Sequence, residues 1–275
     1  MKALALLMAL LATPLAAQNT LVLGATSTTE NSGLLAAILP AFTADTGINV
    51  NVVALGTRQI LALGATGDVD VLIVHHRPSE DAFMAAGQGA ARYDLMYNDF
   101  IIIGPSADPA LVAGAHNAPD AMARIFATQA PFVSRGDESG THLRELAFWA
   151  QAGLSPKGLW YRQVGTGMAA SLNIASAMSA YILSDRATWL SFANRGSLSV
   201  LFEGGAEMRN TYGLIIVNPA LHPHVQAAAA ESFANWMLGP QGQAAIAGFR
   251  LQGQALFCPI SPVIGQEQAK PCNAG

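Results

Sequence analysis

The sequence predicts an α/β protein of two lobes, each lobe a mostly parallel sheet flanked by helices. Short apolar strands alternate with helical segments along the chain, as is typical of βαβ units. Two longer apolar strands, 97–105 and 212–217, are suited to cross from one lobe to the other and back. The chain has four turns rich in glycine and hydroxyl side chains. Two of them precede the first crossing and two follow it. We therefore expect a first lobe of residues 18–100 and 213–275 and a second lobe of residues 101–212.

The elements of the first lobe follow from the spacing of apolar residues. Leu34, Leu35, Ile38 and Leu39 recur at helical spacing, and this helix ends near Pro40 or Thr46. Alternating or continuous apolar runs predict strands, and Gly-Pro or Asn-Pro closes the two long ones. The predicted strands are 21–24, 48–53, 69–74, 97–105 and 212–217. The other predicted helices are a short one that follows the turn 56–59 and ends at Gly64, and two over 225–238 and 240–249.

The second lobe repeats the pattern. A helix is predicted over 118–128, and Asp185 is a cap for a helix that carries Trp189 and Leu190. Ser139 or Thr141 can cap another helix, which continues through Leu146 and Phe148. The remaining predicted elements are strands at 131–133, 181–184 and 201–204 and a helix after 168, and residues 160–164 lead into the turn before that helix without the pattern of a strong strand.

The composition narrows the class of partner. Of 275 residues, 52% are hydrophobic and 12% are charged, which is enough for a large core, and the net charge is −4. No basic run occurs, so a nucleic acid is not an expected partner.

The first residues have the pattern of a secretory signal peptide. Met1 and Lys2 precede a short apolar run, and small residues follow it up to Ala17. The run is far shorter than the about 20 residues of a membrane span. We expect residues 1–17 to be removed and the remaining chain to be exported to the periplasm as a soluble monomer.

Two cysteines, Cys258 and Cys272, lie near the C-terminus. In an oxidising compartment they are expected to form a disulfide. A two-cysteine metal site is the alternative, but histidine partners are missing from the neighbourhood.

The four turns (25–32, 56–59, 134–141 and 165–168) are the candidate binding elements, because each combines glycine, hydroxyls and a helix start. Helix starts present unpaired N–H groups and a partial positive charge, which suits an anion. Arg135 adds a guanidinium, and Asp137 is expected to orient it through a bidentate contact. The candidate ligand-binding residues are Thr26, Ser27, Thr57, Arg135, Ser139, Thr141 and Thr166.

Other chemistries have weaker support in the sequence. Adjacent His75 and His76 point to opposite faces of an extended chain, so we expect polar caps and no metal site. Residues 136–140 do not form the G-x-S-x-G turn of a hydrolase, and His142 has no evident orienting acid. Gly165-Thr166-Gly167 lacks the third glycine of a dinucleotide site. We expect no cofactor and no catalytic activity.

The motifs resemble the tungstate-binding (TupA-like) solute-binding components of bacterial ABC transporters. The resemblance is carried in order by ATSTTENSGLL (25–35), GDVDVLIVHH (67–76), RYDLMYNDFIIIGP (92–105), SRGDESGTH (134–142) and GTGM (165–168), and by segments within 201–219. It implies a type II periplasmic binding protein fold, in which two α/β lobes surround a hinge, and a membrane permease as partner.

The resemblance also implies roles for single residues. Arg135 would be the main charged ligand, with donors from Ser139 and Thr141 and from Thr26 and Ser27. Thr57 and Thr166 would be further donors. Arg58 departs from the family pattern, and it could supply a second positive charge or point to solvent.

Several alternatives stay open at this stage. Molybdate is nearly the size of tungstate, and phosphate and sulfate are bound by proteins of related fold. Phosphate would need an acceptor such as Asp137 or Asp99 directed into the pocket. An exported hydrolase is a remote possibility, as is an adhesion module, which only the Arg135-Gly136-Asp137 triplet suggests.

Overall fold

The fold is seen in a computed structural model of the chain, which describes residues 20–260. The predicted signal peptide (1–17) lies outside the described residues. The predicted disulfide also involves a residue outside them, Cys272, so this bridge stays a prediction. No helix within 20–260 is long and apolar enough to cross a membrane.

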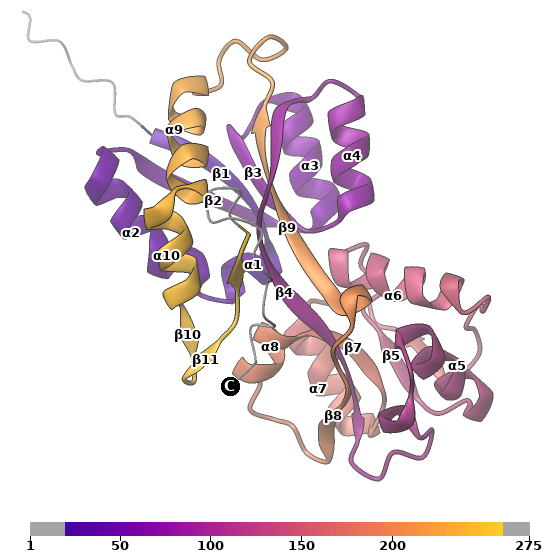
Figure 1. The fold of residues 1–275 in the computed structure, drawn as a ribbon. Coiled ribbons are helices and arrows are strands. Elements are labelled where there is room, and N and C mark those ends of the chain that lie inside the picture. The colour runs from indigo at the N-terminus through magenta and orange to yellow at the C-terminus, as the bar shows by residue number, and fades with distance from the viewer. Residues whose placement is uncertain (1–19, 261–275) are drawn as a thin grey trace, which may run out of the picture.

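The chain folds into two lobes joined by two long strands (Figure 1). The first lobe contains β1 (Thr20–Thr26), α1 (Ser27–Asn31), α2 (Leu34–Thr46), β2 (Asn49–Leu55), α3 (Thr57–Thr66), β3 (Val71–Val74) and α4 (Arg77–Ala85). Its C-terminal part adds α9 (Ala227–Leu238), α10 (Pro240–Gly248), β10 (Arg250–Leu251), β11 (Gln254–Ala255) and β12 (Cys258–Pro259).

The second lobe is built from the middle of the chain. It contains α5 (Ala118–Thr128), β5 (Phe132–Ser134), α6 (Gly140–Gln151), β6 (Tyr161–Gln163), α7 (Met168–Met178), β7 (Ile182–Asp185), α8 (Arg186–Ser191) and β8 (Leu198–Phe202). Two short 3₁₀ helices, Val112–Gly114 and Ala206–Met208, lie in its connections. The expected cap is present: the Asp185 side chain accepts a hydrogen bond from the Thr188 N–H.

The two joining strands are β4 (Gly89–Pro105) and β9 (Arg209–Val217), which run antiparallel to each other. β4 pairs with β9 up to Asp99, and from Phe100 onward it pairs with β7 of the second lobe. This exchange of partners lies where the sequence places the end of the first lobe.

The predicted α/β class is confirmed, and the sheet is mixed. β1 pairs in parallel with β2 and β3, as βαβ units require, and β5 pairs in parallel with β6. The joining strands run antiparallel to β3, β7 and β8, because a chain that crosses between lobes and returns must reverse its direction.

Each lobe has a core on both faces of its sheet. In β3, Val71 and Ile73 pack with Phe233 of α9, whereas Leu72 and Val74 pack on the opposite face with α3 and α4. This alternation follows from the two-residue period of a strand. In β4, Phe100 and Ile102 pack towards α5 and α6, and Ile101 and Ile103 pack towards α7 and α8. Sheets covered on both faces leave ligand sites at the strand ends.

Candidate functional site: an oxyanion cleft between the lobes

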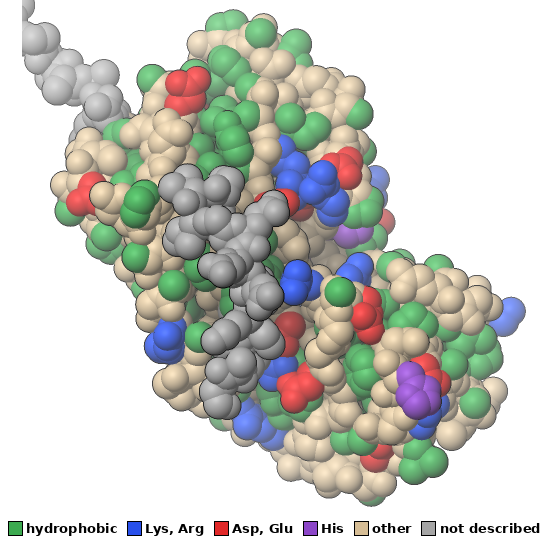
Figure 2. Space-filling model, viewed as in Figure 1, with side chains coloured by type: hydrophobic (Ala, Val, Ile, Leu, Met, Phe, Trp, Pro, Cys, Tyr) green, Lys and Arg blue, Asp and Glu red, His purple; other side chains and the backbone are tan. Residues whose placement is uncertain are grey.

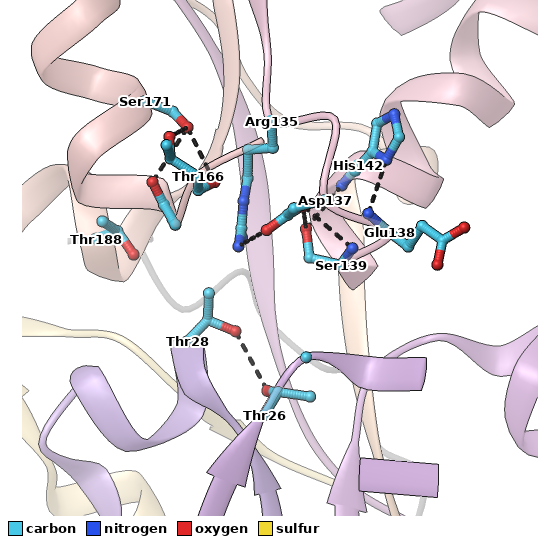
Figure 3. A network of polar contacts seen from close by, with 12 residues as sticks. Thr26, Thr28, Arg135, Asp137, Glu138, Ser139, His142, Thr166, Ser171 and Thr188 are labelled. Carbon is cyan, nitrogen blue, oxygen red and sulfur yellow. Dashed lines mark hydrogen bonds and ion pairs between the residues drawn. The ribbon is translucent and has the colours of Figure 1, made fainter. Parts of the chain in front are cut away.

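The turn between β5 and α6 is a rigid element at the centre of the cleft. Gly136 and Glu138 adopt left-handed φ values of 61° and 56°. A Cβ on Gly136 would also lie 2.9 Å from the Cβ of Gln163, so glycine is required twice over at this position. Ser139 then caps α6, because its Oγ accepts a hydrogen bond from the His142 N–H at 3.3 Å. The turn thus directs Arg135 and Ser139 towards the first lobe (Figure 3).

Arg135 is buried, with only 5% of its surface exposed. Its Nη2 donates to Asp137 Oδ2 at 2.5 Å, while Asp137 Oδ1 accepts from both the N–H and the Oγ of Ser139. The expected bidentate contact is therefore wrong, because one oxygen of Asp137 is occupied by Ser139. Nε and Nη1 of Arg135 are buried without a hydrogen-bond partner within residues 20–260. Two charged donors are therefore available to a ligand.

The first lobe faces Arg135 with the end of β1 and the start of α1 (Figure 3). Thr26 is 3% exposed, and its Oγ1 lies 2.7 Å from Thr29 Oγ1 and 3.2 Å from Thr28 Oγ1. Ser27 lines a cavity of about 580 Å³ together with Arg135. These two predicted residues therefore border the same space from opposite lobes.

Thr57 and Thr141 are both 1% exposed, and neither hydroxyl has a hydrogen-bond partner in the part of the chain that the structure describes. Thr57 is the first residue of α3 and Thr141 the second residue of α6. A buried hydroxyl without a partner is costly, so two such groups at helix starts indicate donors kept for a ligand.

Of the seven predicted residues, only Ser27 and Arg135 line this cavity; Thr26, Thr57, Ser139, Thr141 and Thr166 do not. The Oγ1 of Thr166 lies 3.1 Å from Ser171 Oγ at the start of α7. The neighbouring Gly167 and Met168 do line that cavity. This turn therefore borders the cavity through Gly167 and Met168.

Some cavity residues escaped the sequence reasoning. Thr28, Asn31, Asn173, Thr188 and Asn194 line the cavity with Arg135. Thr28 and Asn31 lie in the predicted turn 25–32, although the sequence does not single them out there. Asn173 and Asn194 carry no glycine-and-hydroxyl signal, and Thr188 follows Asp185, which predicts only a cap. Asparagines in or beside helices carry no local signal of binding, so only the fold could have identified them.

His75 closes the site from the first lobe. Its Nδ1–H donates to Asn210 Oδ1 at 2.9 Å, and its Nε2 lies 3.2 Å from Thr28 Oγ1. Burial, with a smaller effect of the nearby Arg135 charge, lowers the pKa of His75 to about 4. The ring is neutral at pH 7, so Nε2 accepts the Thr28 hydroxyl hydrogen.

The side chains of Ser139 and His142 are bonded to other groups of their own turn. Ser139 Oγ donates to Asp137, and His142 Nδ1 accepts from the Glu138 N–H, so these side chains form no nucleophile–base pair. Within residues 20–260 there is no group of three or more His, Cys, Asp or Glu side chains that could hold a metal ion.

Basic and acidic side chains lie side by side where the lobes meet (Figure 2). A second groove of about 350 Å³ between α4 and α6 is lined by Arg77, Arg144 and Arg209 and by no carboxylate. Such a local field attracts anions to the waist of the molecule.

A two-lobed α/β fold with buried donors between its lobes defines a solute-binding protein. Residues 13–241 match the PBP superfamily domain, to which the chain belongs. Within it, the chain is a member of the TupA family of solute-binding proteins: it is 41% identical over 247 residues to the tungstate-binding protein TupA of Peptoclostridium acidaminophilum, covering 88% of this chain and 86% of the relative.

Other similar proteins also have names that refer to tungstate. The tungstate-binding protein TupA of Campylobacter jejuni is 36% identical over 83% of this chain and 87% of its own length. The solved structure of the tungstate-binding protein TupA from Desulfovibrio alaskensis G20 is 44% identical, with a TM-score of 0.79 over 88% of this chain and 99% of that chain. The tungstate ABC transporter structure from Geobacter sulfurreducens is 43% identical, with a TM-score of 0.77 over 84% and 98%.

Proposed function

We propose that this protein binds tungstate in the cleft between its lobes and delivers it to the permease of an ABC transporter. The observation that carries the proposal is the buried guanidinium of Arg135, whose Nε and Nη1 have no partner among the described residues. Because the Arg135 side chain points towards Thr26 and Thr28 of the other lobe, an ion between the lobes would satisfy these donors (Figure 3).

The donor set suits a fully deprotonated dianion. Arg135 supplies one positive charge, and the starts of α3 and α6 supply partial positive charge and N–H groups. The orphaned hydroxyls of Thr57 and Thr141 add neutral donors. Charge-assisted hydrogen bonds gain strength in a cleft that excludes water.

Hydrogen phosphate must donate one hydrogen bond, and the two candidate carboxylate acceptors, Asp137 and Asp99, are already paired with protein donors. Asp137 accepts from Arg135 and Ser139. Asp99 accepts from Nε of Arg186 at 2.9 Å through both of its oxygens. Both carboxylates already accept hydrogen bonds from protein donors. Tungstate is fully deprotonated and donates no hydrogen bond, so it needs no free acceptor in the site. Discrimination against sulfate would rest on ion size, because the tungsten–oxygen bond is longer.

We further propose that the protein is an exported, periplasmic monomer without catalytic activity. Support comes from the leader-like N-terminal sequence and from relatives that are solute-binding proteins. In this function the lobes would close on the ion by ligand-driven hinge motion about β4 and β9.

Titration calorimetry with tungstate, molybdate, sulfate and phosphate tests the proposal, on the wild type and on Arg135→Ala. We expect tight tungstate binding and at least a tenfold loss in the variant, about 1.4 kcal/mol. Arg124→Ala is the matched control, because this arginine pairs with Asp120 on α5. Equal affinity for phosphate and tungstate would overturn the assignment.

A further inference from the structure

An ion pair joins the two lobes beside the candidate site. Arg58, the second residue of α3, places Nη1 2.7 Å from Oε2 of Glu138 in the turn before α6. The side chains are 78% and 58% exposed, so the contact lies at the surface of the cleft. The sequence leaves two roles open for Arg58, a second positive charge at the ligand or a side chain directed to solvent. In the structure Arg58 instead pairs with Glu138 of the other lobe.

Glu138 is held in place for this contact by its own turn. Its φ of 56° lies in the left-handed region, which a residue with a Cβ adopts at a cost. Its N–H donates to His142 Nδ1 at 3.1 Å, and the preceding Asp137 is tied to Arg135 and Ser139. Less backbone freedom is therefore lost when the pair forms than at an ion pair on a mobile loop.

Each member of the pair directly adjoins a candidate ligand residue. Arg58 follows Thr57, whose buried hydroxyl has no partner within residues 20–260, and Glu138 precedes Ser139. The contact can exist only while the start of α3 and the turn before α6 lie together, as they do here, and it would break if the lobes moved apart.

We propose that Arg58 and Glu138 form a latch that holds the cleft closed over the bound oxyanion and slows its release. This inference rests on the proposed function. Both are positioning residues, because they act on the two turns that carry Thr57 and Ser139. The guanidinium of Arg58 is paired with the carboxylate of Glu138, so Arg58 is not a direct ligand.

The latch is expected to have a modest and salt-dependent effect. Exposed ion pairs contribute little, and a two- to fivefold change in release rate is the range that such a pair supports. Fivefold corresponds to about 1 kcal/mol. Ions screen exposed charges over about 10 Å at 0.1 M salt and about 3 Å at 1 M salt, so the effect should disappear at high salt.

The test measures the release of radioactive tungstate from the loaded full-length protein into an excess of unlabelled tungstate. The variants are Arg58→Gln, Glu138→Gln and the double swap Arg58→Glu with Glu138→Arg. Lys157→Gln and Glu231→Gln are matched controls, since they remove the same charges from exposed positions elsewhere on the surface. Release is followed at low salt and at about 1 M salt.

We expect both single variants to release tungstate two- to fivefold faster at low salt, the swap to restore the wild-type rate, and all rates to converge at high salt. Unchanged release in both single variants would overturn the latch. A second pattern would also overturn it: Arg58→Gln loses much of its tungstate affinity, Glu138→Gln gains affinity, and the double swap does not restore the wild-type value. That pattern would make Arg58 a direct ligand. A wild-type protein that binds no tungstate would instead refute the proposed function.

Discussion

The imidazole of His75 occupies the space that a side chain on Gly140 would need. A Cβ built on Gly140 would lie 2.6 Å from Cε1 and 2.8 Å from Nδ1 of that ring. His75 follows β3 of the first lobe, and Gly140 is the first residue of α6 in the second. The ring cannot easily yield, because it is 7% exposed, hydrogen-bonded at Nδ1 to Asn210 and packed 4.9 Å from the Tyr212 ring. Close approach of the lobes therefore requires glycine at residue 140.

Gly140→Ala should hold the lobes apart. The added methyl group would meet His75 below van der Waals distance, so the closed cleft becomes strained while the open one does not. We expect tungstate affinity to fall by at least tenfold, and small-angle scattering should show less compaction with ligand than in the wild type. Gly248→Ala, with no heavy atom within 4 Å of the new Cβ, is the control. Wild-type compaction in Gly140→Ala would contradict this contact.

Removal of either unpartnered threonine hydroxyl should weaken anion binding without destabilising the ligand-free protein. Thr57→Val or Thr141→Val removes a buried hydroxyl that has no partner among the described residues, so the ligand-free protein should lose no stability. Anion affinity should nevertheless fall by about tenfold for each donor lost, about 1.4 kcal/mol.

Urea unfolding and calorimetry on the same samples separate the two effects. Thr43→Val is a matched control, because its hydroxyl donates to the Ile48 carbonyl oxygen at 2.9 Å, remote from the cleft. That variant should lose stability and keep its affinity. Unchanged affinity in both Thr57→Val and Thr141→Val would remove these residues from the site.

Acid should destabilise the protein through His75. Burial lowers its folded-state pKa to about 4 from an ordinary 6.5, so the unfolded chain binds a proton first as the pH falls. Stability is then complete above about pH 6.5 and is lost on descent towards pH 4. We expect a loss of about 2 kcal/mol between pH 7 and pH 5 that is absent from His75→Gln. Parallel pH profiles of unfolding free energy in the two proteins would refute this assignment.

Base should destabilise the second lobe through Glu145, with the opposite sign. Burial raises its pKa to about 7 from an ordinary 4.5, despite hydrogen bonds to Oε1 from Tyr161 OH at 2.7 Å and Trp149 Nε1 at 3.1 Å. The folded protein retains the proton that the unfolded chain releases, so stability falls as the pH rises from about 4.5 to about 7.

Glu145→Gln keeps the accepting oxygen and removes the titration. We expect it to gain about 2 kcal/mol over the wild type between pH 5 and pH 8, measured by urea unfolding. A stability difference that does not change with pH would show that Glu145 is charged in the folded protein.

Local patterns predicted much of the fold. The helix over 118–128 has the predicted bounds, and the partner exchange of β4 at Asp99 and Phe100 falls at the predicted crossing. Pairing direction depends on contacts between distant strands, which no local pattern reports. The sequence predicts a turn over residues 25–32, because the Thr-Ser-Thr-Thr run lacks apolar periodicity, whereas the structure has a helix over Ser27–Asn31.

In the candidate site, the turn that holds Arg135 and the helix cap at Ser139 could be predicted, because both lie within eight consecutive residues. The role of these residues as ligands stays a prediction. The contact of His75 with Gly140 and the pair of Arg58 with Glu138 join residues from different lobes. Sequence spacing holds no information on such pairs, so they required the folded chain.

The most direct test is a crystal structure with tungstate, located by the anomalous scattering of tungsten. We expect one peak between the lobes, with its oxygens at about 3 Å from Nε or Nη1 of Arg135 and facing Thr26 across the cleft. A tungsten peak bound elsewhere, with Nε and Nη1 of Arg135 still unpartnered, would contradict the account.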